Sequence, residues 1–449
     1  MRKTLVALFV LSLIFTFGFS PNVASQDAEV EFWHSMTGAR LDVLEELVEG
    51  FNEQAEHGNI NPTMIGTYAE GLARFLEAHS IEEEPGIVQI YEVGTQIMHD
   101  SGMIIPAYEI PERLDEDFDF GKYNIPIVEY YSRDGDLWSW PFASSTAMMY
   151  YNADHFEEAG LDPDSPPRTW EEVHEYGNQI IEAGVLDSGI IAFGWPSWQF
   201  EQQHALHNQP FTNEGSGRED HATEVAWPSE FSIDLLSRWG AMAEDDVWFY
   251  AGPEYEVNAA FTGGQVSMIL QSTSSLDGIL GTVGDDFEVR TTFLPRLEGY
   301  PTGNSVIGGN SLYVSNQVSE EELEVIFEFY KYLAEPENDK FWHQNTGYFP
   351  ATNRALRELM DEGWFQESPN HLTAFLQILH GRRDTPHVIG TRIGPFVHSR
   401  EYIREGLERI DAGHDPETVM GETADMVNVL LQDYLEDIEY IQEMELPGE

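Results

Sequence analysis

The chain has no cysteine among its 449 residues, so it forms no disulfide bond and offers no cysteine for a lipid anchor. Basic residues are also scarce: 22 Lys and Arg stand against 80 Asp and Glu, which gives a formal net charge of −58 at pH 7. The acidic residues are spread along the whole chain and do not form a tail. Such a surface repels nucleic acid and anionic membranes, and we expect neither as a partner.

Long apolar runs are missing too, except for one near the N-terminus. Residues 5–19 are largely apolar, Arg2 and Lys3 precede them, and small residues follow at 23–25. This order is typical of a secretory signal peptide over residues 1–25, and the run is short for a membrane span. An exported protein without an anchor needs an outer membrane to retain it, so we expect it in a periplasm of the Gram-negative type.

The acidic excess has a physical consequence. Removal of Arg2 and Lys3 with the signal peptide leaves 20 basic against 80 acidic residues, a net charge of −60. Repulsion among these charges destabilises the compact state at low salt. At about 1 M salt the screening length falls to roughly 3 Å, and the repulsion largely vanishes. The composition favours a halophilic source, with an ordinary acidic secreted protein as the alternative.

Length and pattern predict a two-domain α/β protein. The 424 residues after the signal peptide exceed what one core usually supports. Val30 and Phe32 alternate with acidic residues as in a strand, and residues 87–91 form an apolar run typical of a buried parallel strand. Between them, residues 41–51 predict an amphipathic helix and Thr67 can cap another. In such sheets, ligands bind at the carboxyl ends of the strands.

The segment from Tyr150 to Glu172 is the most informative part of the sequence. Residues 147–151 form an apolar run that is typical of a buried strand, and prolines then break the chain. Thr169 opens a helix with Glu172 three positions on, which predicts a capping box. The pattern consists of Tyr150-Tyr151-Asn152, Phe156, Ala159-Gly160-Leu161-Asp162-Pro163, Pro166-Pro167, Thr169-Trp170 and Glu172. It resembles the signature of the family 1 extracellular solute-binding proteins, the capture subunits of ABC uptake systems.

Further segments, in the order found in this family, resemble its glycerol-3-phosphate-binding members. They are Phe32-Trp33-His34-Ser35-Met36, Gln89-Ile90-Tyr91-Glu92-Val93-Gly94-Thr95, Pro141-Phe142-Ala143-Ser144-Ser145-Thr146, Ile307-Gly308-Gly309, Trp342-His343-Gln344-Asn345-Thr346-Gly347-Tyr348 and Thr391-Arg392-Ile393-Gly394. The resemblance covers nearly the whole mature chain. It implies glycerol-3-phosphate or a glycerophosphodiester as the ligand and an ABC permease of the inner membrane as the partner. We expect a monomer without a cofactor.

The resemblance also implies the fold: a type II, two-lobed periplasmic-binding-protein fold that closes like a hinged trap on a ligand in the cleft between its lobes. We expect one lobe at residues 26–138 plus 289–340 and the other at 143–285 plus 345–445. The expected crossings between the lobes are Trp140-Pro141, Thr292-Phe293 and Asn345-Thr346.

Eight ligand-binding residues follow from matching the family pattern. Glu92 stands at the carboxyl end of a predicted strand and is expected to accept hydrogen bonds from ligand hydroxyls. Tyr68, at a helix start, and Tyr348 match ligand-contacting tyrosines, although either is also compatible with a packed aromatic side chain. Ser145 and Ser272 match serines of two serine-rich loops, where short hydroxyls donate well to phosphate but also serve as ordinary helix caps.

The remaining three supply a backbone contact, an apolar wall and a positive charge. Gly309 would let a backbone N–H approach the ligand. Trp195 would cover the glycerol carbons, a role that Trp198 could fill instead. Arg392 lies between glycines and not on a solvated helix, and a guanidinium can bind phosphate through two parallel hydrogen bonds. Its alternative is an ion pair with one of the many carboxylates.

The pattern departs from the family beside the site, at residues 195–198 and 202–207. These departures leave the ligand open between glycerol-3-phosphate, a glycerophosphodiester such as glycerophosphocholine, and a neutral oligosaccharide.

An enzyme, such as a periplasmic phosphodiesterase or glycosidase, is the alternative class. The sequence has neither His-Glu-x-x-His nor Gly-x-Ser-x-Gly. Asp115, Asp117 and Asp119 resemble part of a calcium loop, but Gly121 comes one position late and Pro126 stands where the loop needs Glu. We therefore expect neither catalysis nor a bound metal.

Overall fold

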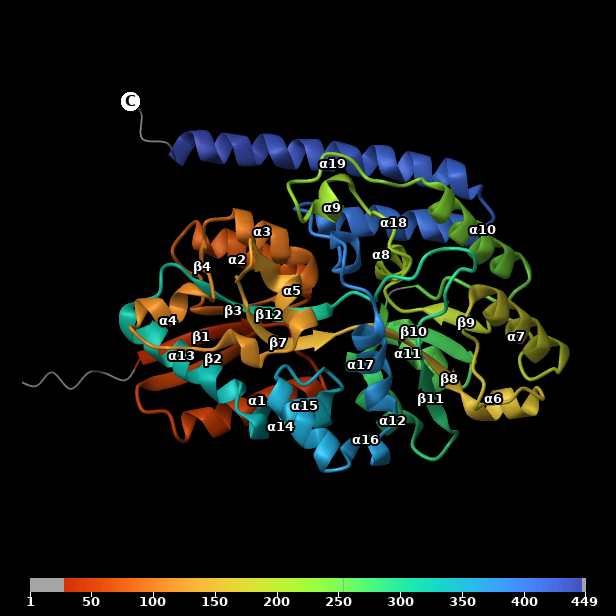
Figure 1. Ribbon diagram of the computed structural model, residues 1–449, viewed down its shortest axis with the longest axis horizontal. Helices are drawn as coiled ribbons and strands as arrows, with labels where there is room; N and C mark the ends of the chain where they lie inside the picture. The colour runs from red at the N-terminus through yellow and green to blue at the C-terminus, as the bar shows by residue number, and fades with distance from the viewer. Residues whose placement is uncertain (1–27, 253, 446–449) are drawn as a thin grey trace, which may run out of the picture.

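The computed structural model describes residues 28–252 and 254–445, so the signal peptide predicted at 1–25 lies outside the described residues. Two β-sheets form the centres of two lobes that lie side by side (Figure 1). No helix in the described part of the chain is long and apolar enough to cross a membrane. The fold is the two-lobed α/β architecture that the sequence predicts.

The two central strands of the first sheet, β3 and β12, have largely buried side chains, whereas β1 and β2 each have exposed ones. The sheet has the order β2-β1-β3-β12-β4, with β7 paired to β12; β1, β2 and β3 run parallel, and β12 runs antiparallel to β3. The strands are β1 (Ala28–His34), β2 (Gly58–Met64), β3 (Ile87–Tyr91), β4 (Ile104–Ile105), β7 (Trp140–Ser145) and β12 (Gly308–Ser315). All five side chains of β3 are buried, as its apolar sequence predicts.

Helices α1, α2 and α13 pack on this sheet. Thr67 forms a capping box with Glu70 at the start of α2, which confirms its predicted role, and Ser319 forms another with Glu322 in α13. The first lobe contains α1 (Ala39–Asn52), α2 (Tyr68–His79), α3 (Thr95–Asp100), α4 (Glu109–Arg113), α5 (Ile125–Tyr131), α13 (Glu320–Leu333), α14 (Pro336–Thr346) and α15 (Asn353–Asp361). A two-stranded hairpin, β5 (Ser132–Arg133) and β6 (Asp136–Leu137), turns at Asp134-Gly135, where both residues have positive φ.

The second sheet has the order β11-β8-β10-β9. Strands β8 and β10 are buried along their whole length, so the apolar run at 147–151 forms the predicted buried strand. The strands are β8 (Ala147–Asn152), β9 (Ile191–Phe193), β10 (Met268–Ser272) and β11 (Val289–Thr292). Thr169 and Glu172 form the predicted capping box at the start of α7.

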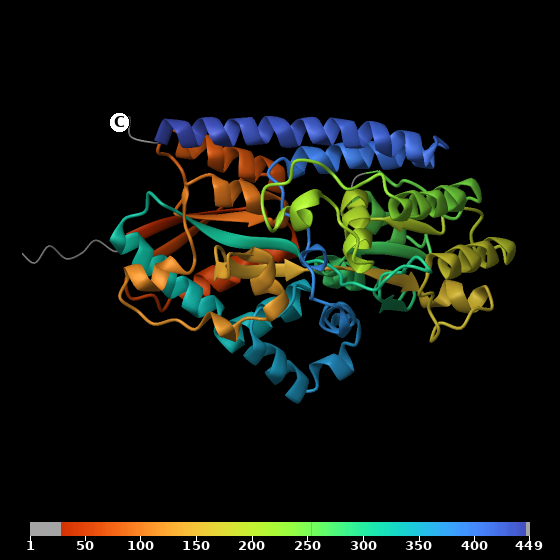
Figure 2. The ribbon, with the colours of Figure 1, turned by 45° about the horizontal axis from the view of Figure 1, so that its top comes forward.

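The second lobe is completed by helices on both faces of this sheet (Figure 2). They are α6 (Ala153–Glu158), α7 (Trp170–Glu182), α8 (Pro196–Leu206), α9 (Asn213–Gly217), α10 (Glu230–Glu244), α11 (Glu254–Thr262), α12 (Leu276–Val283), α17 (Asn370–His380) and α18 (Phe396–Asp411). The short helix α16 (Trp364–Glu367) follows α15. The last helix, α19 (Pro416–Glu445), packs on α18 and α10 and extends across both lobes (Figures 1 and 2).

The three expected crossings lie elsewhere. Asn345-Thr346 forms the end of α14, and α15, which packs on α14, also belongs to the first lobe and not to the second as expected. Residues 140–145 form β7 and pair with β12, so the chain leaves the first sheet after Ser145 and enters the second at Ala147. Residues 289–292 pair with β8 in the second sheet, not in the first lobe as expected, because β11 is an edge strand antiparallel to β8. The chain returns to the first sheet only with β12.

Candidate functional site

A cavity of about 410 Å³ lies between the two lobes. From the first lobe and the segment after α14 it is lined by Thr37, Gly38, Ala39, Arg40, Tyr68, Tyr91, Glu92, Ser145, Gly309, Asn345, Thr346 and Tyr348. From the second lobe it is lined by Trp195, Trp198, Asn258, Gln271, Ser272, Ser274, Ser275, Asp277, Gly278 and Arg400. Seven of the eight residues predicted from the sequence line this cavity: Tyr68, Glu92, Ser145, Trp195, Ser272, Gly309 and Tyr348.

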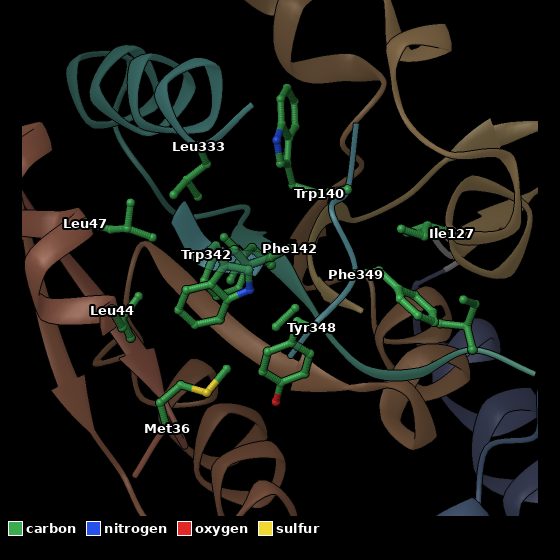
Figure 3. Close-up of a cluster of buried hydrophobic side chains, with 14 of the residues drawn as sticks. Met36, Leu44, Leu47, Ile127, Trp140, Phe142, Leu333, Trp342, Tyr348 and Phe349 are labelled. Carbon is green, nitrogen blue, oxygen red and sulfur yellow. The ribbon is translucent and has the colours of Figure 1, made fainter. Parts of the chain in front are cut away.

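Tyr348 joins the cavity to the core of the first lobe. Its ring lies parallel to that of Trp342, which in turn stacks on Phe142, with centroids 5.6 and 4.6 Å apart (Figure 3). The Tyr348 hydroxyl oxygen lies 3.4 Å from that of Tyr68 at the start of α2. Tyr68 stacks on Tyr91 with ring centroids 5.5 Å apart. Packing thus fixes the rings and leaves phenol groups at the cavity wall.

Glu92 follows β3 directly and is buried, with 7 % of its surface exposed. Its Oε1 accepts a hydrogen bond from Nη1 of Arg400 over 2.7 Å. The other terminal nitrogen of Arg400 donates to Oε2 of Glu201, on α8, over 2.6 Å. Burial raises the pKa of Glu92, and the attraction of Arg400 opposes that rise.

Serine hydroxyls meet where β7 of the first sheet approaches β10 of the second. The hydroxyl of Ser272 donates to that of Ser145 over 3.1 Å and lies 3.0 Å from the hydroxyl of Ser274. Ser272 also caps the 3₁₀ turn Thr273–Ser275 that leads into α12, where its side chain accepts from the N–H of Ser274. Arg40, in the first turn of α1, donates to the Ser274 hydroxyl over 3.4 Å. Two helix starts and a guanidinium therefore converge on this group of hydroxyls.

Gly309 stands at a register shift between β12 and β7, with a φ of +90°. A Cβ atom added there would lie 2.1 Å from the carbonyl oxygen of Ala143. The position therefore requires glycine both for its backbone conformation and for the close approach of the neighbouring strand.

Both tryptophans that the sequence left as alternatives line the cavity. Trp195 has a left-handed backbone with a φ of 55° and precedes α8, and Pro196 occupies the first position of that helix, where its missing N–H is tolerated. Trp198 packs against Gly308, whose added Cβ would lie 2.4 Å from the indole ring.

Arg392 does not line the cavity, contrary to the expectation from the sequence. Its guanidinium donates to the carbonyl oxygens of Ser132 and Arg218, at 2.8 and 3.3 Å. Desolvation lowers the pKa of Arg392, and Arg133 lowers it further. The glycines that flank its segment let the backbone turn inward, and the side chain then joins the two lobes through carbonyl groups, away from the cavity.

Arg400, and not Arg392, is the arginine of the second lobe that lines the cavity. The sequence around Arg400 is rich in charged residues and is typical of a solvated helix, so this composition alone does not mark Arg400 as a ligand-binding residue. A signal did exist, because Arg400 falls on the apolar stripe of α18, in register with Phe396, Ile403 and Leu407. A charged residue on a buried stripe indicates a paired or functional group.

The segment that resembles part of a calcium loop contains a capped turn. Asp119 caps a 3₁₀ turn by accepting from the N–H of Gly121 over 2.9 Å. Within residues 28–252 and 254–445, no group of three or more His, Asp or Glu side chains could hold a metal ion.

Comparison with known proteins matches residues 46–373 to the family described as bacterial extracellular solute-binding protein. The chain is 32 % identical over 430 residues to the sn-glycerol-3-phosphate-binding periplasmic protein UgpB of Rhizobium meliloti, covering 94 % of this chain and 98 % of that protein. It is 31 % identical over 437 residues to the UgpB protein of Salmonella typhimurium, covering 96 % and 98 %.

Among solved structures, the fold is similar to that of UgpB from Mycobacterium tuberculosis in complex with glycerophosphocholine. The TM-score is 0.74 at 20 % identity, and the match covers 92 % of this chain and 99 % of that one. It is also similar to the sugar-binding protein MalE from Xanthomonas citri, with a TM-score of 0.70 at 19 % identity over 94 % and 100 % of the two chains. At these identities the two structures support the fold alone.

Proposed function

Because the chain belongs to the bacterial extracellular solute-binding protein family, we propose that it captures glycerol-3-phosphate or a glycerophosphodiester and delivers it to an ABC permease. As a member of this family it is a binding protein and not an enzyme, and it works outside the cytoplasmic membrane. The observation that carries the ligand proposal is the two-ended chemistry of the cavity, which offers a carboxylate and a guanidinium at one end and a group of hydroxyls beside a second guanidinium at the other.

We assign the glycerol hydroxyls to the end formed by Glu92 and Arg400. A carboxylate accepts hydrogen bonds from hydroxyl groups, and a guanidinium can donate to their oxygens. Tyr68 and Tyr348 border this part of the first lobe and add phenol groups that both donate and accept. Trp195 and Trp198 supply apolar surface for the carbon atoms.

We assign the phosphate to the end formed by Ser145, Ser272, Ser274 and Arg40. Serine hydroxyls donate to phosphate oxygens, and the first turns of α1 and α12 carry partial positive charge. Arg40 adds a formal positive charge at the first turn of α1. In a chain with so few cations, this placement favours an anionic group at this end.

The binding cycle that we propose is closure of the two lobes around the ligand. Ser145 and Glu92 belong to the first lobe and Ser272 and Arg400 to the second, so a ligand that touches all four makes its full set of contacts only when the lobes are together. Such a ligand shifts the equilibrium toward the closed form by its differential affinity for the two forms.

A neutral oligosaccharide remains the second candidate because of the aromatic surface in the cavity. The stacked rings of Tyr68 and Tyr91, together with Trp195 and Trp198, are the kind of apolar walls on which sugar rings pack.

Isothermal titration calorimetry on the purified protein tests the proposal, with glycerol-3-phosphate, glycerophosphocholine and maltose as ligands. We expect one-to-one binding of at least one of the two phosphate compounds, and mass spectrometry should recover that compound unchanged from the complex. Binding of maltose with no heat from either phosphate compound would replace the proposal by the oligosaccharide.

A further inference from the structure

Glu201 is a buried carboxylate on α8 that does not line the cavity, with 1 % of its surface exposed. Both of its oxygens are engaged. Oε1 accepts from the backbone N–H of Thr391 over 2.9 Å, and Oε2 accepts from Nη2 of Arg400 over 2.6 Å. Glu201 therefore touches the ligand cavity only through Arg400.

Arg400 is held on three sides. Glu92 of the first lobe takes one terminal nitrogen, Glu201 of the second lobe takes the other, and the guanidinium carbon lies 4.6 Å from the ring centroid of Phe396. Desolvation works against the charged guanidinium, but the attraction of the two carboxylates outweighs it and raises the pKa of Arg400. The two carboxylates thus fix the position and orientation of the Arg400 guanidinium.

One guanidinium between two carboxylates leaves this cluster with a net charge of −1. Glu92 and Arg400 both line the cavity with opposite charges, so the excess negative charge is that of Glu201, which lies directly behind Arg400. If Arg400 were paired with Glu92 alone, the same end of the cavity would be electrically neutral. Among these three groups Glu201 therefore sets the sign of the charge, and the guanidinium of Arg218, which also attracts Glu201, offsets part of it.

We propose that Glu201 is a positioning residue that determines specificity: by compensating and fixing Arg400, it reserves this end of the cavity for uncharged hydroxyls and disfavours a doubly charged phosphate monoester. The inference rests on the proposed function, because it concerns how the same cavity chooses among phosphate-bearing glycerol compounds. The wild-type protein then favours a phosphodiester over the monoester more strongly than a protein without this charge does.

The test is the ratio of two affinities in the variant Glu201→Gln, measured by calorimetry at pH 8. Glycerol-3-phosphate is a dianion at this pH, whereas glycerophosphocholine has no net charge. The glutamine side chain keeps an acceptor for Thr391 and removes one negative charge. We expect the affinity ratio of glycerol-3-phosphate to glycerophosphocholine to rise about tenfold, which corresponds to about 1.4 kcal/mol. A merely structural role would lower both affinities and leave their ratio unchanged.

The exposed Glu401, next to Arg400 on α18, provides the matched control. Glu401→Gln makes the same change in net charge and should leave the ratio unaltered, because solvent screens an exposed charge. If Glu201→Gln does not fold, as judged by circular dichroism, Glu201→Asp keeps the charge and shifts it by one methylene; it should weaken both ligands without changing their ratio.

The outcomes separate the two proposals. Wild-type protein that binds neither compound refutes the proposed function and this inference together. Wild-type binding with an unchanged ratio in Glu201→Gln, or a changed ratio in Glu201→Asp, refutes the inference alone.

Discussion

Arg400 donates to Glu92 over 2.7 Å, and this ion pair joins α18 of the second lobe to the end of β3 in the first. It is the contact that distinguishes Arg400 from Arg392, whose guanidinium donates to the backbone carbonyl oxygens of Ser132 and Arg218. Of these two arginines, Arg400 is therefore the one positioned to take part in both ligand binding and closure.

We accordingly expect Arg400→Ala to weaken binding of the phosphate-bearing ligand by about 2–5 kcal/mol, the scale for truncating one partner of a buried, hydrogen-bonded charge pair. Arg392→Ala should lower the melting temperature and cost much less affinity than Arg400→Ala, because its partners lie outside the cavity. Calorimetry measures the affinity of both variants, and circular dichroism checks that each variant is folded. Equal losses of affinity in the two variants would show that Arg392 acts on the site after all.

The sequence predicted the elements of the fold well, because their signals are local. The capping box of Thr169 and Glu172, the cap at Thr67 and the buried strand at 87–91 each depend on a few neighbouring residues. The cavity residues are scattered over the chain, and it was the family resemblance that brought seven of them together.

Crossings between the lobes gave no such local signal. Strands β7 and β8 are both fully buried and are separated only by Thr146, so nothing typical of an exposed loop marks the change of sheet. The Thr146 hydroxyl donates to the carbonyl oxygen of Val306, a partner 160 positions away. No rule of periodicity could have anticipated this contact, which lies at the junction of the two sheets.

Another contact between the lobes, that of His221 with Asp100, predicts that the stability of the protein depends on pH. Nε2 of His221, between α9 and α10, lies 3.0 Å from Oδ2 of Asp100 at the end of α3. The same oxygen accepts from Gln96 over 2.7 Å and from Tyr434 of α19 over 2.8 Å. Arg133 donates to the other oxygen over 3.4 Å, and Asp220 lies 3.7 Å from Nδ1 of His221.

The hydrogen bond to Asp100 raises the pKa of His221. Its contribution to stability is therefore complete below the unfolded value of about 6.5 and is lost as the pH rises through the higher folded pKa. Burial would raise the pKa of Asp100, but the hydrogen bonds from His221, Gln96 and Tyr434 lower it, so its contribution is lost only in strong acid. The pair contributes most between about pH 5 and 6.5.

We expect His221→Gln to lower the free energy of unfolding by about 1 kcal/mol near pH 5.5, and the difference from wild type to shrink as the pH rises above about 6.5. Urea unfolding from pH 5 to 9 measures it. The exposed His398 supplies the control, since His398→Gln should differ little from wild type at any pH in this range. A difference for His221→Gln that grows with pH would mean that neutral His221 is the stabilising form.

The charge of the chain leads to the last prediction, on salt. Cations are so few that single ones serve two carboxylates, as Lys340 does with Glu358 and Glu362. Most acidic groups therefore face solvent and one another, as the exposed Glu46 and Glu49 of α1 do. Their repulsion acts over about 10 Å at 0.1 M salt and over roughly 3 Å at 1 M. We expect the melting temperature to rise steadily between these concentrations of NaCl.

The double variant Glu46→Gln, Glu49→Gln separates this repulsion from a general effect of salt on burial. Removing two exposed negative charges should raise the melting temperature at 0.05 M NaCl, and the gain should shrink toward zero at 1 M, where the charges are already screened. The affinity for an anionic ligand should hold or rise over the same range, because the body that the ligand approaches has a large negative charge. A gain in melting temperature that is equal at both salt concentrations would show that the two substitutions act through helix propensity or the dipole of α1. A steep loss of affinity with added salt, in protein that circular dichroism shows to be folded, would mean that Arg40 and Arg400 govern the approach of the ligand and the net charge does not.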